Sequence, residues 1–157
     1  EEVFAEFGLT PSSTTNAFSF KSYTRKINFG LRTVYNGNAS FFLEPLEATS
    51  LPAMDKIQRW AMDVWQGYEY SDVVNDEYKK YFKQTEYMIM SHYAAGSIYK
   101  NDFWSMAQDK GMKCYEAMLK DPEYKSFIRS DKLLNYGTWS QKSFHTNFPP
   151  LGLSLGD

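Results

Sequence analysis

The sequence contains little cysteine, little histidine and no long apolar run. Among its 157 residues there is one cysteine, Cys114, and there are two histidines, His92 and His145. A single cysteine excludes an intramolecular disulfide framework and a zinc site made only of cysteines. No apolar stretch approaches the roughly 20 residues that cross a bilayer, so we expect no membrane span. The first residues also lack the basic and apolar regions of a secretory signal.

Sequence signatures of catalysis are equally scarce. His92 falls on the apolar stripe of a predicted helix, where a histidine satisfied by a core hydrogen bond is the favoured interpretation. Cys114 has no nucleophile elbow around it, and the two histidines are too far apart in the sequence to indicate a metal site. Gly96 and Gly111 are isolated, so no glycine-rich phosphate loop is present. We therefore predict that the protein is not an enzyme, with a small enzyme or a ligand-binding helical domain as an alternative.

Aromatic residues are what the sequence has in abundance. Twelve Phe, twelve Tyr and four Trp make up 18% of the chain. A domain of this size has limited room for so many buried rings, and rings are also favoured at protein interfaces. We expect some of them to contact a partner, while the others fill the core.

Charge is divided unevenly along the chain. Residues 1–7 hold three Glu, and residues 8–43 hold four cations and no carboxylate, although the whole chain has a net charge of -2. A basic segment attached to an acidic body indicates an acidic partner. The alternative is a solvated basic strand that merely resists edge pairing.

The basic segment is also rich in rings, which makes it the candidate docking surface. We predict that its cations and aromatic residues bind a partner, namely Phe18, Phe20, Lys21, Tyr23, Arg25, Lys26, Phe29, Arg32 and Tyr35. Rings that alternate with basic side chains also occur on nucleic-acid-binding strands, but the isoelectric point near 5.7 and the absence of a basic run in the body argue against that partner.

Within this segment the pattern predicts a β-hairpin. Apolar residues alternate from Ile27 to Tyr35, Asn36-Gly37 follows as a turn signal, and residues 39–43 offer a returning strand. An isolated hairpin is marginal in water, so it should lie against the helical body or against another protein.

Helical spacing begins at Ser50. The pattern predicts a helix up to Gly67, a longer helix from Ser71 to near Gly96, a third from about Asn101 to Asp121, and a short fourth helix that begins at Pro122. The segment after Gly137 has no clear periodicity.

The fold class expected from these patterns is mainly α, a small bundle of 3–4 helices with an N-terminal extended arm, a β-hairpin and an irregular C-terminal tail. We divide the chain into an irregular arm (1–17), a basic aromatic hairpin segment (18–45), a helical domain (50–136) and a tail (137–157). Such extensions become ordered when a surface is available to them, and we expect the basic segment to use the surface of a neighbour.

Two stretches together resemble the linker polypeptides of red-algal phycobilisomes, including the γ-type members. They are residues 18–35 and residues 93–127, with the lone cysteine in GMKCYEAML. The resemblance implies a non-enzymatic scaffold of a light-harvesting assembly in the plastid stroma of a photosynthetic cell, docked on acidic phycobiliprotein subunits. It also implies Cys114 as an attachment point for a bilin cofactor. An accessory subunit of another organellar complex fits the same composition.

Overall fold

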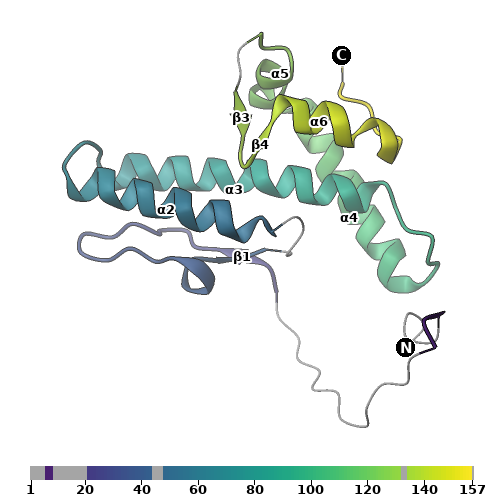
Figure 1. Cartoon of the computed structure of the whole chain (residues 1–157), viewed down its shortest axis with the longest axis horizontal. Helices are drawn as coiled ribbons and strands as arrows, with labels where there is room; N and C mark the ends of the chain where they lie inside the picture. Colours follow the sequence, from purple (N-terminus) through teal and green to yellow (C-terminus); the bar gives the residue numbers. More distant parts are fainter. Residues whose placement is uncertain (1–5, 9–20, 44–47, 132–133, 157) are drawn as a thin grey trace.

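The computed structural model describes residues 6–8, 21–43, 48–131 and 134–156, and in these residues the fold is mainly helical, as predicted (Figure 1). The helices are α2 (Ser50–Trp65), α3 (Ser71–Ala94), α4 (Asp102–Lys120), α5 (Pro122–Ile128) and α6 (Gln141–Asn147). The strands are β1 (Tyr23–Thr24), β2 (Phe41–Phe42), β3 (Asn135–Tyr136) and β4 (Trp139–Ser140), and the 3-10 helices are η1 (Gly37–Ala39) and η3 (Pro149–Leu151).

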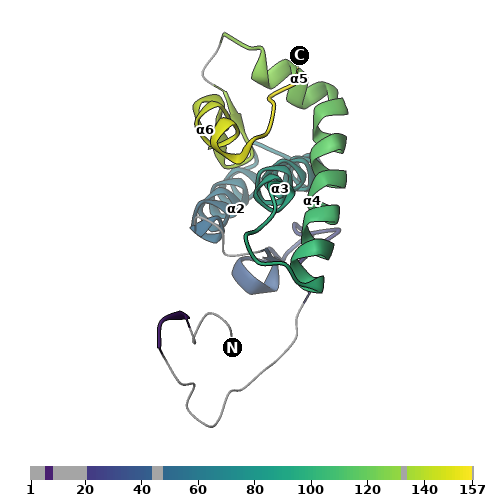
Figure 2. The same cartoon turned by 90° about the vertical axis from the view of Figure 1, so that its right-hand side faces the viewer.

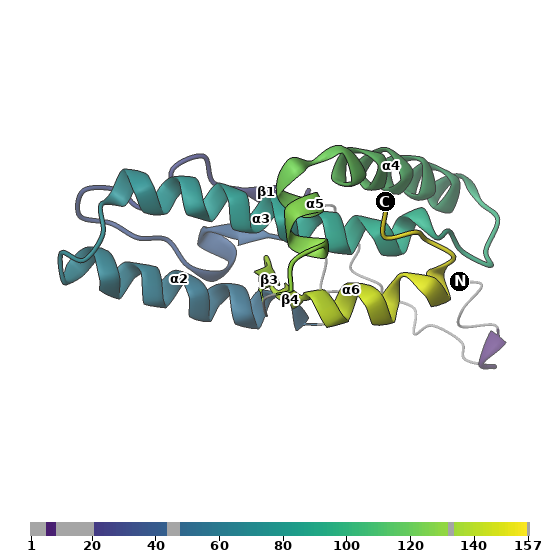
Figure 3. The same ribbon diagram turned by 90° about the horizontal axis from the view of Figure 1, so that it is seen from above.

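Helix α3 is the longest helix described and lies at the centre of the fold, where α2, α4 and β3 pack against it. Seen from above, α2 lies beside the first half of α3 and α6 beside the second half (Figure 3). Helix α4 crosses the second half of α3 steeply, as the view along α3 shows (Figure 2). Gly111 allows the crossing, because a Cβ atom there would lie 2.4 Å from the backbone nitrogen of Ala94.

The two halves of α3 contribute to separate aromatic clusters. The N-terminal cluster consists of Phe29, Phe41, Ala53, Ile57, Trp60, Val74, Tyr78, Tyr81 and Phe82. The C-terminal cluster consists of Tyr87, Met88, Ile89, Ala94, Tyr115, Met118, Tyr124, Phe127, Tyr136, Trp139, Phe144 and Phe148. Rings therefore supply most of the bulk of both cores.

The predicted helices are confirmed, and their ends follow ordinary capping rules. The Asn101 side chain accepts a hydrogen bond from the Trp104 backbone nitrogen at 3.1 Å, which starts α4. Asp121 ends α4 and accepts from the Glu123 nitrogen at 2.9 Å, which caps α5 one residue before Pro122.

The sequence interpretation missed α6 within the C-terminal segment. The Ser140 hydroxyl accepts from the Ser143 nitrogen and caps this short helix. Phe144 and Phe148, four residues apart, are both fully buried. A serine cap followed by this spacing is a helical signal, but a single pair of rings was too little to count as periodicity. Residues 152–156, which follow η3, have no regular structure.

The hairpin exists, but its strands and its turn differ from the predicted ones. Tyr23 pairs with Phe42 and Thr24 with Phe41, and a separate bridge joins Phe29 to Val34. The Gly30 nitrogen donates to the Thr33 oxygen at 2.8 Å, so the chain already turns between these two residues. The predicted turn at Asn36-Gly37 comes later in the chain. The continuous strand predicted from residue 27 to residue 35 is therefore wrong.

None of the helices in the described part of the chain combines the length and the apolar character that a membrane span requires.

Candidate functional site

A cleft opens where the two aromatic clusters meet, and it is the candidate ligand site. Its volume is about 560 Å³, and α2, α3, α5 and β3 contribute to its walls. Trp60 and Tyr81 come from the N-terminal cluster, and Phe127 and Tyr136 from the C-terminal cluster. These four residues are buried in the protein and also line the cleft, so they form its floor.

Charged side chains stand around this aromatic floor. The Lys80 ammonium lies 3.2 Å from a carboxylate oxygen of Glu123, which joins α3 to α5 across the cleft. The Lys56 ammonium lies 4.9 Å from the centre of the Trp60 ring, within the range of a cation–π contact. Glu77 completes the charged lining. The rim therefore offers both signs of charge above an apolar surface.

Fixed polar groups add directionality to the floor. The Tyr81 and Thr138 hydroxyls are 2.7 Å apart, and the Gly137 nitrogen donates to the Gln84 side-chain oxygen at 2.8 Å. Burial raises the pKa of Tyr81 despite its hydrogen bond to Thr138, so the phenol stays protonated at neutral pH. Within the described residues, the Gln84 amide nitrogen has no hydrogen-bond acceptor of its own, so it can donate to a ligand.

A buried carboxylate supports the wall of the cleft. Asp121 accepts from Lys83 at 2.9 Å and from the hydroxyls of Tyr87 and Tyr136 at 3.2 and 3.4 Å. Burial alone would raise the pKa of Asp121, but hydrogen bonds from Lys83 and from the Glu123 backbone outweigh it and lower the pKa below the usual value. The ionised Asp121 thus joins α3, the α4–α5 corner and β3.

The histidines lie away from this cleft. The Nδ1 atom of His92 is 2.9 Å from the Met88 carbonyl oxygen, and this contact satisfies the ring within its own helix. His145 is exposed on α6. In the parts of the chain that are described, no group of His, Cys, Asp and Glu could hold a metal ion.

Cys114 does not have the properties of a reactive thiol. It is half-buried against the C-terminal cluster. Burial, with a smaller contribution from Glu86, raises the pKa of Cys114 to about 11, so the thiol is protonated at neutral pH. The structure does not support the role as a bilin attachment point that the resemblance implied.

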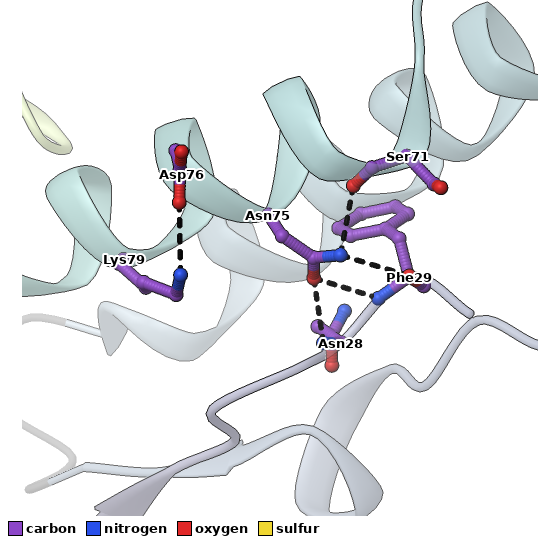
Figure 4. Close-up of polar contacts among 6 residues, drawn as sticks. All are labelled: Asn28, Phe29, Ser71, Asn75, Asp76 and Lys79. Atoms are coloured by element: carbon purple, nitrogen blue, oxygen red, sulfur yellow. Dashed lines mark hydrogen bonds and ion pairs between the residues drawn. The ribbon is translucent and has the colours of Figure 1, made fainter.

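The basic hairpin segment is held by its own chain (Figure 4). The Asn75 side-chain oxygen accepts from the backbone nitrogens of Asn28 and Phe29, and its amide nitrogen donates to the oxygens of Phe29 and Ser71. The Tyr78 hydroxyl donates to the Ser40 oxygen at 3.0 Å. Of the two supports predicted for the hairpin, the structure therefore shows the helical body. For residues 21–43 these supporting contacts come from the chain itself, and the expectation that the segment also binds a neighbour stays a prediction.

The predicted partner-binding residues have different environments. Lys21, Tyr23, Lys26 and Arg32 are exposed, whereas Arg25 and Tyr35 are half-buried and stacked on each other with 3.6 Å between the guanidinium carbon and the ring centre. Phe29 is 2% exposed within the N-terminal cluster, so its ring is not available as an anchor for a partner. Phe18 and Phe20 lie outside the described residues.

Sequence reasoning missed most of the cleft. Trp60, Tyr81 and Phe127 lie within predicted helices, but the cleft also depends on Tyr136 and on the fold of the C-terminal segment. The only trace of the cleft in the sequence was the opposite charge of Lys80 and Glu123. Nothing in a single sequence indicates that these two side chains meet.

Fold and cleft together define a helical domain with a cleft that is lined by aromatic and charged side chains. The chain belongs to the tryptophan halogenase family, whose sequence model matches residues 1–140. No curated protein and no solved structure matches the chain.

This membership corrects the interpretation as a phycobilisome linker. The family is enzymatic, so the predictions of a non-enzymatic scaffold, of a protein that is not an enzyme and of a role in light harvesting and photosynthesis are wrong. The comparisons also give no support to a bilin or to a plastid location. The resemblance depended on rings, basic residues and one cysteine, and these features do not identify a family.

Proposed function

We propose that this chain is part of a flavin-dependent halogenase and that its cleft binds the aromatic substrate. The family match supports the enzyme class. The observation that carries the assignment of the site is the cleft with a floor of four aromatic residues and a rim of both charges. An aromatic amino acid matches this cleft, because it has an apolar ring at one end and both an ammonium and a carboxylate group at the other.

In this proposal the ring of the substrate lies against Trp60 and Phe127, since stacked and edge contacts between rings are favourable. The carboxylate of the substrate pairs with Lys56 or Lys80, and its ammonium group pairs with Glu77 or Glu123. The Gln84 amide nitrogen donates a further hydrogen bond. Binding is the task assigned to these residues, because the described part of the cleft has no nucleophile with a histidine beside it.

The described residues do not fit the flavin that the family uses. Dinucleotide phosphates are usually cradled by a glycine-rich turn between a parallel strand and a helix. The sheets described here are antiparallel pairs of two-residue strands, and no two of the nine glycines are closer than four positions. We therefore propose that residues other than those described hold the flavin, and that the described residues contribute the binding of the aromatic substrate.

Calorimetric titration with L-tryptophan tests the proposed cleft. We expect saturable binding of L-tryptophan and none of L-alanine, which lacks the ring. Replacing Lys80 with Gln should weaken binding by about tenfold, the value of one charge-assisted contact. The matched control is Lys79→Gln, because Lys79 is the neighbouring residue, pairs with Asp76 and does not line the cleft. Absence of binding, or equal losses in the two variants, would reject the cleft as the substrate site.

A further inference from the structure

The second feature with the character of a site is a cationic cavity on the hairpin. Its volume is about 540 Å³, and its walls are formed by Arg25, Lys26, Ile27, Gly30, Thr33 and Tyr35. Two of these six residues are cations and none is an acid. No residue lines both this cavity and the aromatic cleft, so the two sites are separate.

Arg25 is fixed in place within this cavity. Its backbone nitrogen donates to the Ser40 oxygen at 3.1 Å and lies 3.4 Å from the Tyr78 hydroxyl. Its guanidinium carbon lies 3.6 Å from the centre of the Tyr35 ring. The side chain is therefore preorganised and loses little freedom when a ligand binds.

The guanidinium group has a donor that its own chain does not satisfy. The Nε atom of Arg25 is buried and has no hydrogen-bond partner among the described residues. Stacking on Tyr35 uses the face of the guanidinium and leaves the in-plane N–H groups free. A buried donor without a partner is costly, and a charged one more so, which favours an acceptor from outside the chain.

The electrostatics of the segment specify the chemistry of that acceptor. Residues 21–43 carry four cations and no carboxylate, and none of the four cations forms an ion pair in the described structure. Lys26 supplies a second positive charge at the cavity, and Thr33 a hydroxyl. This set matches an oxyanion, which accepts hydrogen bonds from a guanidinium in its plane.

We propose that the cavity formed by Arg25, Lys26, Thr33 and Tyr35 is a binding site for an oxyanion, either a phosphate group or a carboxylate. The in-plane N–H groups of Arg25 donate to the oxyanion, and Lys26 neutralises the remaining charge of the oxyanion. The Tyr35 ring stacks on one face of the guanidinium and fixes its orientation.

Proton–nitrogen NMR spectra of the whole chain test this site directly, because the Nε–H group of Arg25 gives its own signal. Three probes are titrated separately at constant ionic strength: inorganic phosphate, acetate and a blocked Glu-Glu dipeptide. We expect a saturable shift of the Arg25 signal with at least one probe. A tighter fit to phosphate than to either carboxylate identifies a phosphate ligand, and the reverse order identifies an acidic peptide segment. No saturable shift with any of the three would overturn the proposal.

Matched variants separate a built site from general attraction between charges. Arg25→Gln and Lys26→Gln should each weaken binding by about tenfold. Arg32→Gln removes the same charge from the same segment but does not line the cavity, so it should leave the affinity unchanged. Lys26 is exposed, and its variant remains informative if Arg25→Gln fails to fold. A loss in Arg32→Gln equal to the losses in the other two would contradict the site.

Discussion

The two aromatic clusters are similar in composition but differ in how they hold distant parts of the chain. In the N-terminal cluster the hairpin strands are only two residues long, so few backbone groups are paired within the sheet. Asn75 and Tyr78, both from α3, bond to those groups instead. In the C-terminal cluster the backbone is mostly helical, and rings pack on rings around the polar contacts of Asp121.

This difference shows what replaces regular secondary structure where it is short. Buried backbone N–H and C=O groups must be paired. The Asn75 amide has one acceptor oxygen and one donor nitrogen, so it binds the backbone of Phe29 as a neighbouring strand would. Both clusters are built on one continuous helix, which makes us expect them to unfold together.

The largest expected effect comes from removing a ring from either cluster. Trp60→Ala and Phe144→Ala should each lower the free energy of unfolding by about 3–5 kcal/mol, since the loss of a buried ring leaves a cavity. Because α3 joins the clusters, each variant should unfold in a single transition, followed by circular dichroism and by tyrosine absorbance during urea titration.

Trp65 provides the matched control for this comparison. It lies on the same helix as Trp60 but is 79% exposed, so Trp65→Ala should change the stability by no more than about 0.5 kcal/mol. Two separate transitions in Trp60→Ala would show that the clusters are independent units and would contradict the comparison.

The next effect tests the polar attachment of the hairpin. Asn75→Ala removes the bonds to Asn28 and Phe29 and leaves buried backbone groups without partners, so we expect a loss of about 2–4 kcal/mol. Hydrogen exchange of the Phe29 amide should accelerate more than that of amides in α4.

Asp76→Ala is the control, because Asp76 is adjacent on α3 but exposed, and it pairs with Lys79 at 2.8 Å (Figure 4). It should change the stability by no more than about 0.5 kcal/mol. Unchanged exchange at Phe29 in Asn75→Ala would show that packing, and not the amide, holds the hairpin.

Gly111→Ala tests the close crossing of α3 and α4 in the C-terminal cluster. In an exposed helix this change stabilises by about 1 kcal/mol. Here the new Cβ would lie 2.4 Å from the Ala94 nitrogen and 2.8 Å from the Met90 oxygen, so we expect a net loss of about 1–3 kcal/mol. Thermal unfolding measures the sign, and Lys110→Ala, at an exposed site on α4, serves as the control. A stabilised Gly111→Ala would mean that the helices can separate at little cost.

Local features were predictable from the sequence, and contacts between distant residues were not. Spacing and caps gave α2, α3, α4 and α5, because these signals lie within a few residues of each other. The Asn75 side chain looks like an ordinary polar residue of a helix, and its partner Phe29 is 46 positions away. The same applies to Lys80 and Glu123, the pair that closes the cleft.

The hairpin shows how a correct local signal can still give a wrong arrangement. Alternation placed Ile27, Phe29 and Leu31 on one face, but the turn at Gly30 breaks the strand after Phe29. Phe29 is therefore buried while Leu31 is 98% exposed. The turn between Gly30 and Thr33 sets which side chains face the core, and the periodicity of side chains does not reveal where such a turn falls.

The smallest expected effect depends on pH and concerns Asp121. Its pKa is lowered in the folded protein, so its contribution to stability is present above the pKa of the unfolded chain and is lost as the pH falls through the folded-state value. Asp121→Asn should cost about 1–2 kcal/mol at neutral pH, and the difference from the unchanged protein should shrink below about pH 4, where aspartates become protonated. Urea titrations at several pH values measure this difference.

Asp109→Asn is the control, because Asp109 is an exposed carboxylate with a lysine partner on the same helix, and it should show almost no pH-dependent difference. If the difference in the free energy of unfolding between Asp121→Asn and the unchanged protein persists at pH 2, the packing of the Asp121 side chain, and not its charge, stabilises the C-terminal cluster.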